Sequence, residues 1–139
     1  MGAAQPTHLA FVATKADHVP QHARAALAAL LRDLVGEAAS GADRSVHAMA
    51  ALRATEDTTV LREGREIEAV SGVPLGQERR RPFDPGDVPM KRPDAAFWAG
   101  GPFRFEGFRP PLLDADARLG VPHLGLDAVL ADVIGDALA

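Results

Sequence analysis

The residues best suited to chemistry lie close to the start of the sequence, at Thr14, Lys15 and Asp17. They directly follow an apolar run at 8–14 (HLAFVAT), whose length and Phe-Val pair are typical of a buried strand. A segment with helical spacing comes next, and ligands of α/β proteins commonly bind where such a strand ends. An ionised carboxylate at that point can accept a pair of hydrogen bonds from one ligand. A lysine stem can cover a flat ligand while its ammonium group stays in water.

The tetrapeptide Thr14-Lys15-Ala16-Asp17 resembles the base-recognition motif of P-loop GTPases, which is usually Asn-Lys-x-Asp and has a threonine variant. The resemblance implies that Asp17 recognises guanine. Guanine presents a ring N–H beside an exocyclic amine, and adenine offers no such pair of donors. It also implies that Lys15 packs on the base. The residues alone leave an alternative open, in which Asp17 only caps the helix that begins near Pro20.

GTPases of this kind carry a second base loop, in which a backbone N–H after the next strand binds the guanine carbonyl oxygen. The next strand-like run in this sequence is 45–52 (SVHAMAAL), and small residues at its end allow a backbone to approach a ligand closely. We therefore predict one nucleotide-binding set and no catalytic or metal-ligating residue. The set consists of Thr14, Lys15, Asp17, Ala50, Ala51 and Leu52.

The elements around these loops are predicted to form a βαβ unit. Apolar residues recur at three- and four-residue spacing across 20–37, which predicts a helix. Pro20 suits the first helical turn, where its missing N–H costs little. A strand, a helix and a second strand in this order predict parallel strands with a right-handed crossover.

The rest of the chain has a different sequence pattern from that of the βαβ unit. Short β-prone runs at 58–61 and 67–70 flank a predicted hairpin turn at 62–66. Residues 72–122 are rich in Pro and Gly, and we expect a long irregular segment held to the core by its aromatic side chains. Those aromatics are Phe97, Trp98, Phe103, Phe105 and Phe108. Apolar spacing then predicts a final amphipathic helix at 126–138.

Composition narrows the possible classes of protein. The 139 residues suit one domain, and 47% hydrophobic residues can build a core. The formal charge of -4 gives no reason to expect nucleic acid as a partner. The chain has no cysteine, which excludes disulfides and thiolate metal sites. It has no apolar run of about 18 residues, so we expect no membrane span and a cytoplasmic location.

Two other groups of residues have ordinary explanations. His18 and His22 are four apart, as metal-binding pairs on helices are, but no third ligand is evident and we expect solvent-exposed imidazoles. The run 79–81 (RRR) could bind phosphate, but a solvated loop is the prediction for an acidic protein.

Longer stretches resemble the end of the YcjX-like family. They are HLAFVATKADHVP, ALRAT, DVP, AFW, FRFEGFRPP and LDAVLADVIGDAL, and together they extend from about residue 8 to residue 138. The family consists of bacterial, GTPase-like P-loop proteins associated with stress responses. The resemblance implies an α/β fold, the C-terminal part of a P-loop-NTPase-like doubly wound parallel sheet. Residues 1–139 would then form a single domain, a C-terminal fragment of a GTPase-like domain, with a β-hairpin and a Pro/Gly/aromatic loop inserted at 58–124.

The sequence departs from the GTPase pattern because it contains no G-x-x-x-x-G-K-[ST] phosphate-binding loop. We expect that GTP or GDP with Mg²⁺ is the ligand of the full-length protein, that none is bound by this chain alone, and that the chain alone does not hydrolyse GTP. The expected partners are guanine nucleotide and the missing N-terminal half or another protein. The alternative function is a non-catalytic interaction module, with the FRPP loop and the aromatic clusters as its working surface.

Overall fold

The computed structural model describes residues 8–41, 43–113 and 120–138 and contains two separate sheets. In the first, β1 (Leu9–Ala13) pairs in parallel with β2 (Arg44–Ala48), in register from Leu9 opposite Arg44 to Ala13 opposite Ala48. Two 3₁₀ turns and a helix connect them: η1 (Ala16–His18), η2 (Gln21–Ala23) and α1 (Arg24–Val35). A further 3₁₀ turn, η3 (Gly36–Ala39), follows α1. The predicted βαβ unit is confirmed.

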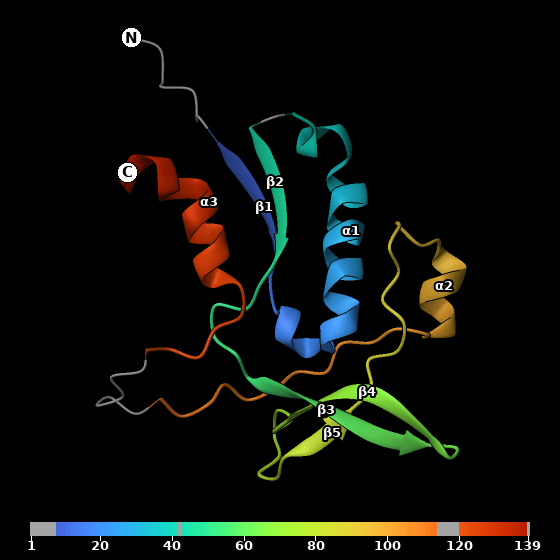
Figure 1. Cartoon of the computed structure of the whole chain (residues 1–139). Helices are drawn as coiled ribbons and strands as arrows, with labels where there is room; N and C mark the ends of the chain where they lie inside the picture. The colour runs from blue at the N-terminus through green and yellow to red at the C-terminus, as the bar shows by residue number, and fades with distance from the viewer. Residues whose placement is uncertain (1–7, 42, 114–119, 139) are drawn as a thin grey trace.

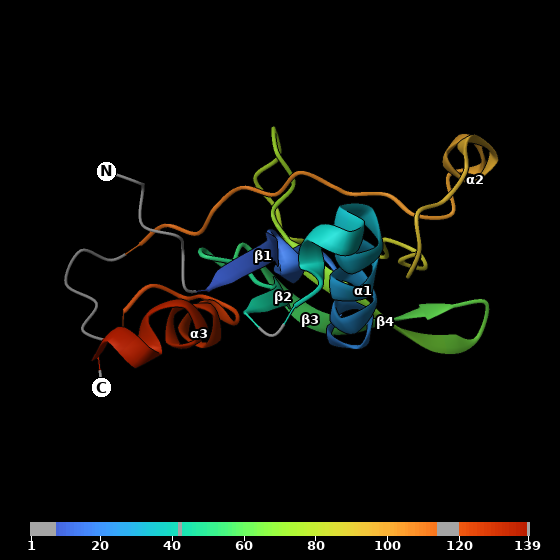
Figure 2. The same cartoon turned by 90° about the horizontal axis from the view of Figure 1, so that it is seen from above.

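The parallel sheet lies between two helices. α1 packs on one side of it, and α3 (Leu126–Leu138) lies on the other (Figures 1 and 2). α1 buries Leu27 and Leu30. β2 ends at Ala48, earlier than the apolar run at 45–52 suggests. Beyond that point Ala50 leaves the ladder and pairs with Leu124, each N–H donating to the other residue's carbonyl at 2.8 Å.

The second sheet is antiparallel. β3 (Thr55–Arg62) and β4 (Arg65–Gly72) form the predicted hairpin, and β5 (Arg81–Phe83) pairs with β4 as a third strand. The turn consists of only Glu63 and Gly64, both with positive φ (50° and 76°). Positive φ at both positions is the conformation whose twist matches a hairpin.

The segment at 72–122 contains more structure than the sequence indicates. It includes β5 and a short helix, α2 (Ala95–Gly100), whose Asp94 accepts a hydrogen bond from the N–H of Phe97 at 2.9 Å. Both elements are too short for a periodic pattern to show. Phe103 and Phe108 are buried, as predicted for anchoring aromatics, but the prediction is wrong for Trp98 and Phe105, which are 52% and 53% exposed.

The main core lies beneath the loop that follows β1. It contains Ala16, Val19, Ala23, Leu27, Val88 and Phe103. Residues from η1, from α1 and from the aromatic segment therefore meet in one cluster. This packing fixes the position of the Thr14–Asp17 loop.

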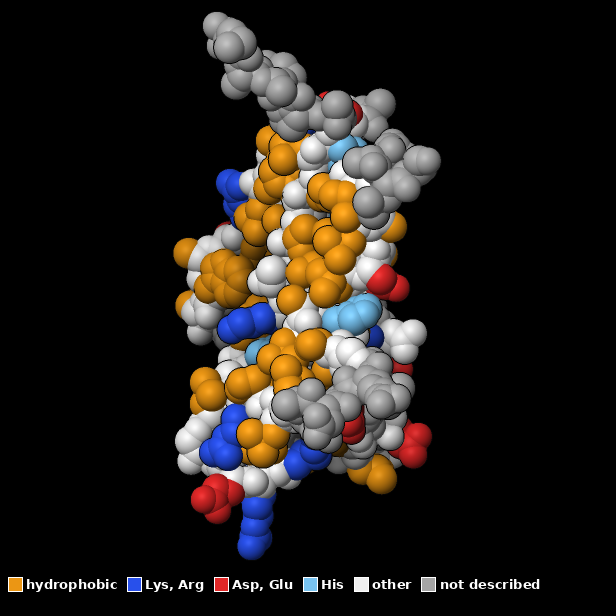
Figure 3. Space-filling view, turned by 90° about the vertical axis from the view of Figure 1, so that its left-hand side faces the viewer, with side chains coloured by type: hydrophobic (Ala, Val, Ile, Leu, Met, Phe, Trp, Pro, Cys, Tyr) orange, Lys and Arg blue, Asp and Glu red, His pale blue; other side chains and the backbone are white. Residues whose placement is uncertain are grey.

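α3 is attached to the parallel sheet through one carboxylate. The Ser45 hydroxyl donates to Asp132, and the Nε2 atoms of His47 and His8 lie 2.6 and 3.1 Å from the same oxygen. The hydrogen bond from Ser45, followed by that from His47, lowers the pKa of Asp132 from 3.8 to about 2. Figure 3 shows hydrophobic side chains gathered on one face of the molecule. Two apolar side chains of α3, Leu130 and Val133, are exposed.

No helix among the described residues is long and apolar enough to cross a bilayer.

Candidate functional site

A pocket of about 310 Å³ opens where β1 and β2 end. All six residues of the predicted nucleotide-binding set line it, so two stretches more than thirty positions apart in the sequence meet at one cavity. The full lining is Thr14, Lys15, Asp17, His18, Met49, Ala50, Ala51, Leu52, Ala54, Phe108 and Pro110.

Backbone hydrogen bonds hold the two loops together. The Met49 N–H donates to the Ala13 carbonyl at 2.9 Å, and the Ala16 N–H donates to the Met49 carbonyl at 3.0 Å. Lys15 adopts a left-handed conformation (φ 59°, ψ 34°), which lysine rarely adopts. This turn leaves Thr14 and Lys15 exposed at the pocket, while the next residue, Ala16, enters the core.

Asp17 is only 1% exposed and connects the two loops through its side chain. Its Oδ2 atom accepts hydrogen bonds from the N–H groups of Ala54 at 2.7 Å and Thr55 at 3.2 Å. The Thr55 hydroxyl donates to the carbonyl of Asp17. The capping alternative is not what the structure contains, because the Asp17 carboxylate accepts from Ala54 and Thr55, and the Gln21 N–H at the start of η2 donates to Asp57 at 2.9 Å.

The second oxygen of Asp17 has a different environment. Within the described part of the chain Oδ1 forms no hydrogen bond, and Nε2 of His18 lies 3.9 Å away. Oδ2 already accepts two N–H donors, which matches the acceptor capacity of one carboxylate oxygen. Oδ1 is therefore the oxygen that can accept hydrogen bonds from a ligand.

The second loop is held from outside by the segment that leads into α3. Ala50 is buried and pairs with Leu124, and the Arg53 N–H donates to the Pro122 carbonyl at 2.7 Å. Ala51 lies between these two attachments and is exposed. The loop is thus fixed at both ends and open in the middle.

The sequence interpretation missed five lining residues: His18, Met49, Ala54, Phe108 and Pro110. The prediction of an exposed His18 is wrong, because its ring is buried and its Nδ1 donates to the Glu106 carbonyl at 3.0 Å. Phe108 packs edge-on against His18, with ring centroids 5.1 Å apart. The Phe-rich run was a visible signal for a structural role, but nothing in it indicated which cavity it would line.

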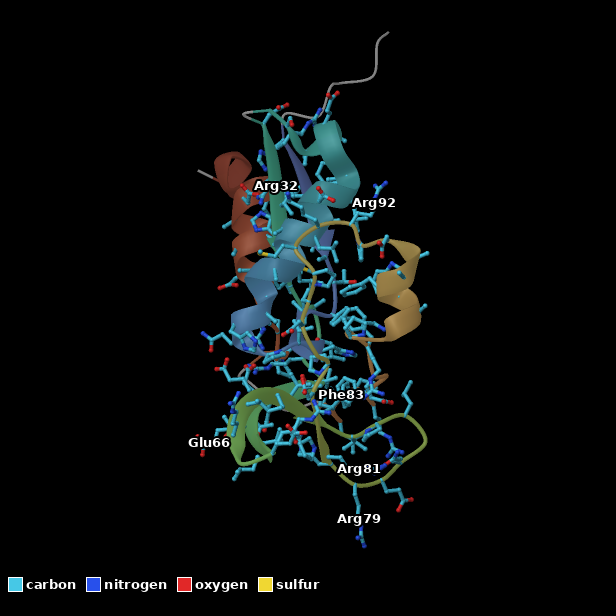
Figure 4. The ribbon with its side chains drawn as sticks, turned by 90° about the vertical axis from the view of Figure 1, so that its right-hand side faces the viewer. Arg32, Glu66, Arg79, Arg81, Phe83 and Arg92 are labelled. Carbon is cyan, nitrogen blue, oxygen red and sulfur yellow. The ribbon has the colours of Figure 1, made fainter. Side chains whose placement is uncertain are left out.

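The other candidates lie elsewhere. Nδ1 of His22 lies 2.5 Å from Oε2 of Glu68, whereas Nδ1 of His18 donates to the Glu106 carbonyl, so the two rings have different partners. Among the described residues, no group of three His, Cys, Asp or Glu side chains is arranged to hold a metal ion. The three arginines at 79–81 are exposed, and Figure 4 shows Arg79 and Arg81 at the end of the molecule that carries the hairpin.

Comparison with known proteins identifies the family of this chain. The model of the YcjX-like family, DUF463, matches residues 4–138. The chain belongs to the YcjX-like family. It is 37% identical over 135 residues to the Ras-like GTPase YcjX of Escherichia coli (strain K12), and 31% identical over 137 residues to the Ras-like GTPase YcjX of Shewanella oneidensis.

These relatives are considerably longer than the chain. Each alignment covers 94% of this chain, but only 29% of the Escherichia coli protein and 28% of the Shewanella oneidensis protein. The YcjX-like residues described here therefore correspond to less than a third of either relative, and the pocket at the strand ends lies within that part.

Proposed function

We propose that this chain carries the guanine-recognition site of a YcjX-like GTPase. The observation that supports the proposal most is the meeting of Thr14, Lys15 and Asp17 with Ala50, Ala51 and Leu52 around one pocket. The names of the relatives, Ras-like GTPase YcjX, support the nucleotide class.

The polar groups around the pocket suit the edge of guanine. Oδ1 of Asp17 can accept from the ring N1–H and the exocyclic amine, and a charged acceptor strengthens both hydrogen bonds. The N–H groups of Ala51 and Leu52 donate to no carbonyl within the described residues, which leaves a donor for the guanine carbonyl oxygen. The Lys15 stem lines the same cavity and can cover the base.

The proposal extends to the rest of the protein in the following way. The βαβ unit would belong to a doubly wound P-loop sheet, and residues 58–124 would be an insertion within that single domain. GTP or GDP with Mg²⁺ would be the ligand of the full-length protein, and we assign no residue of this chain to Mg²⁺. These 139 residues contain no G-x-x-x-x-G-K-[ST] motif, so we expect no GTP hydrolysis by this chain alone. The cytoplasmic location and the role in stress responses stay predictions.

The direct test is a titration of the ¹⁵N-labelled chain with GMP and AMP, followed by amide chemical shifts. We expect GMP at millimolar concentrations to shift the signals of Thr14, Lys15, Ala51 and Leu52, and AMP to leave them in place. Equal responses to the two nucleotides, or no response to either, would favour the interaction-module alternative.

A further inference from the structure

The aromatic segment that follows α2 contributes to the same region as the base loop. A second pocket, of about 340 Å³, is lined by Thr14, Lys15, His18, Phe105, Glu106 and Gly107. It shares Thr14, Lys15 and His18 with the first pocket, so the two cavities are neighbours. Phe108 and Pro110 line the first cavity, and residues 105–107 line the second.

This segment is held firmly where it lies. His18 donates to the Glu106 carbonyl at 3.0 Å, the Leu75 N–H donates to the Gly107 carbonyl at 2.8 Å, and the Arg109 N–H donates to the Val73 carbonyl at 2.7 Å. Its conformation is therefore set before any ligand arrives, which lowers the entropy lost on binding.

Phe105 is the member of the segment with an aromatic face available for contact. It is 53% exposed, while its partner Phe103 is 6% exposed and supports it edge-on with ring centroids 4.9 Å apart. A half-exposed ring that is fixed by a buried ring and lines a cavity beside Lys15 suits contact with a flat or sugar-like ligand.

We infer that Phe105 contacts the bound nucleoside, and that His18 positions the segment 105–110 beside the base loop for this contact. The inference rests on the proposed guanine site and adds to it a residue from the aromatic segment, far from the Thr14–Asp17 loop in sequence. Aromatic contacts of this kind change affinity by about fivefold or more when the ring is removed.

Trp98 provides a matched control. It is 52% exposed and is supported by Phe97 with ring centroids 5.3 Å apart, so it resembles Phe105 in exposure and in support. Trp98 lines neither pocket, and α2 lies to the side of the parallel sheet (Figures 1 and 2).

The experiment measures GMP binding by amide shifts for the wild-type chain, Phe105→Ala, Phe105→Leu and Trp98→Ala. We expect Phe105→Ala to weaken binding about fivefold or more, Phe105→Leu to weaken it less, and Trp98→Ala to leave it unchanged. In the wild type we also expect nuclear Overhauser effects between GMP protons and the Phe105 ring.

A second pair of variants tests the positioning role of His18. His18→Asn keeps a side-chain N–H that can reach the Glu106 carbonyl, whereas His18→Leu has a similar size and no donor. We expect His18→Asn to preserve the Overhauser effects to Phe105 and His18→Leu to lose them.

The outcomes separate this inference from the proposed function. If GMP shifts the base loops and Phe105→Ala binds GMP as well as wild type, the inference is overturned and the guanine site stands. The inference also fails if Trp98→Ala weakens binding as much as Phe105→Ala, because the effect would then be general. If GMP does not bind the wild type, the proposed function fails together with the inference.

Discussion

Replacing Asp17 by asparagine should convert a preference for guanine into one for xanthine. The structure fixes how the new amide must lie. The position of Oδ2 faces two N–H donors, from Ala54 and Thr55, so the amide oxygen occupies that place and the NH₂ group takes the place of Oδ1. The link between the two loops is thereby kept, and only the group that faces the ligand changes from acceptor to donor.

The magnitude follows from that reversal. The NH₂ group would face the exocyclic amine of guanine, leaving polar groups unpaired in a nearly buried place, since Asp17 is 1% exposed. Such a loss costs about 2–4 kcal/mol where a charged group is involved, or roughly 30- to 1,000-fold in affinity. Xanthine carries a carbonyl at that position, which can accept from the NH₂ group. The N1–H of either base loses its acceptor in the variant, so GMP loses both hydrogen bonds while XMP forms one with the amide, and the variant should prefer XMP to GMP.

The assay compares GMP and XMP in titrations of the wild-type chain and Asp17→Asn, again by amide shifts at Lys15 and Ala51. Asp17→Ala is the control. It should lose GMP without acquiring a preference for XMP, and it should lower the melting temperature because the N–H groups of Ala54 and Thr55 lose their acceptor. An unchanged preference for GMP in Asp17→Asn would refute the reasoning and leave Asp17 as a link between loops only.

Three further predictions concern stability and affinity. A Cβ at Gly72 would lie 2.7 Å from the Phe108 ring and 2.9 Å from the Thr55 methyl group. Gly72→Ala should therefore lower the free energy of unfolding, measured by urea titration, by about 1–3 kcal/mol. Gly100→Ala is the control and should not destabilise the protein, because its Cβ would meet nothing closer than 3.8 Å. Because the pKa of Asp132 is lowered to about 2 in the folded protein, its stabilising contribution is present above about pH 4 and is lost as the pH falls toward 2. Asp132→Asn should therefore lose less stability than wild type between pH 4 and pH 2, and equal losses in urea unfolding would contradict this. Calorimetry should find GTP binding no tighter than about 1 mM, because the triphosphate meets no preorganised phosphate loop in these residues, and micromolar binding would count against it.

Much of the frame could be predicted from local pattern. The apolar run before Thr14, the helical spacing that follows it and the second apolar run at 45–52 were enough to predict the parallel pair β1 and β2, because burial imposes these periods on the sequence. The hairpin followed from two β-prone runs around Glu63 and Gly64. The end of β2 could not be predicted in this way, since β2 ends at Ala48 and Ala50 pairs instead with Leu124, which is distant in sequence.

The sequence by itself determined which residue types stand at the ends of the two strands, because short-range spacing and strand length depend on neighbouring residues alone. The tertiary structure decided how those residues are used. In the folded chain one oxygen of Asp17 accepts hydrogen bonds from the N–H groups of Ala54 and Thr55, and the buried ring of His18 donates to the carbonyl of Glu106. Partners 37 and 88 positions away are chosen by packing in three dimensions, and no local pattern records that choice.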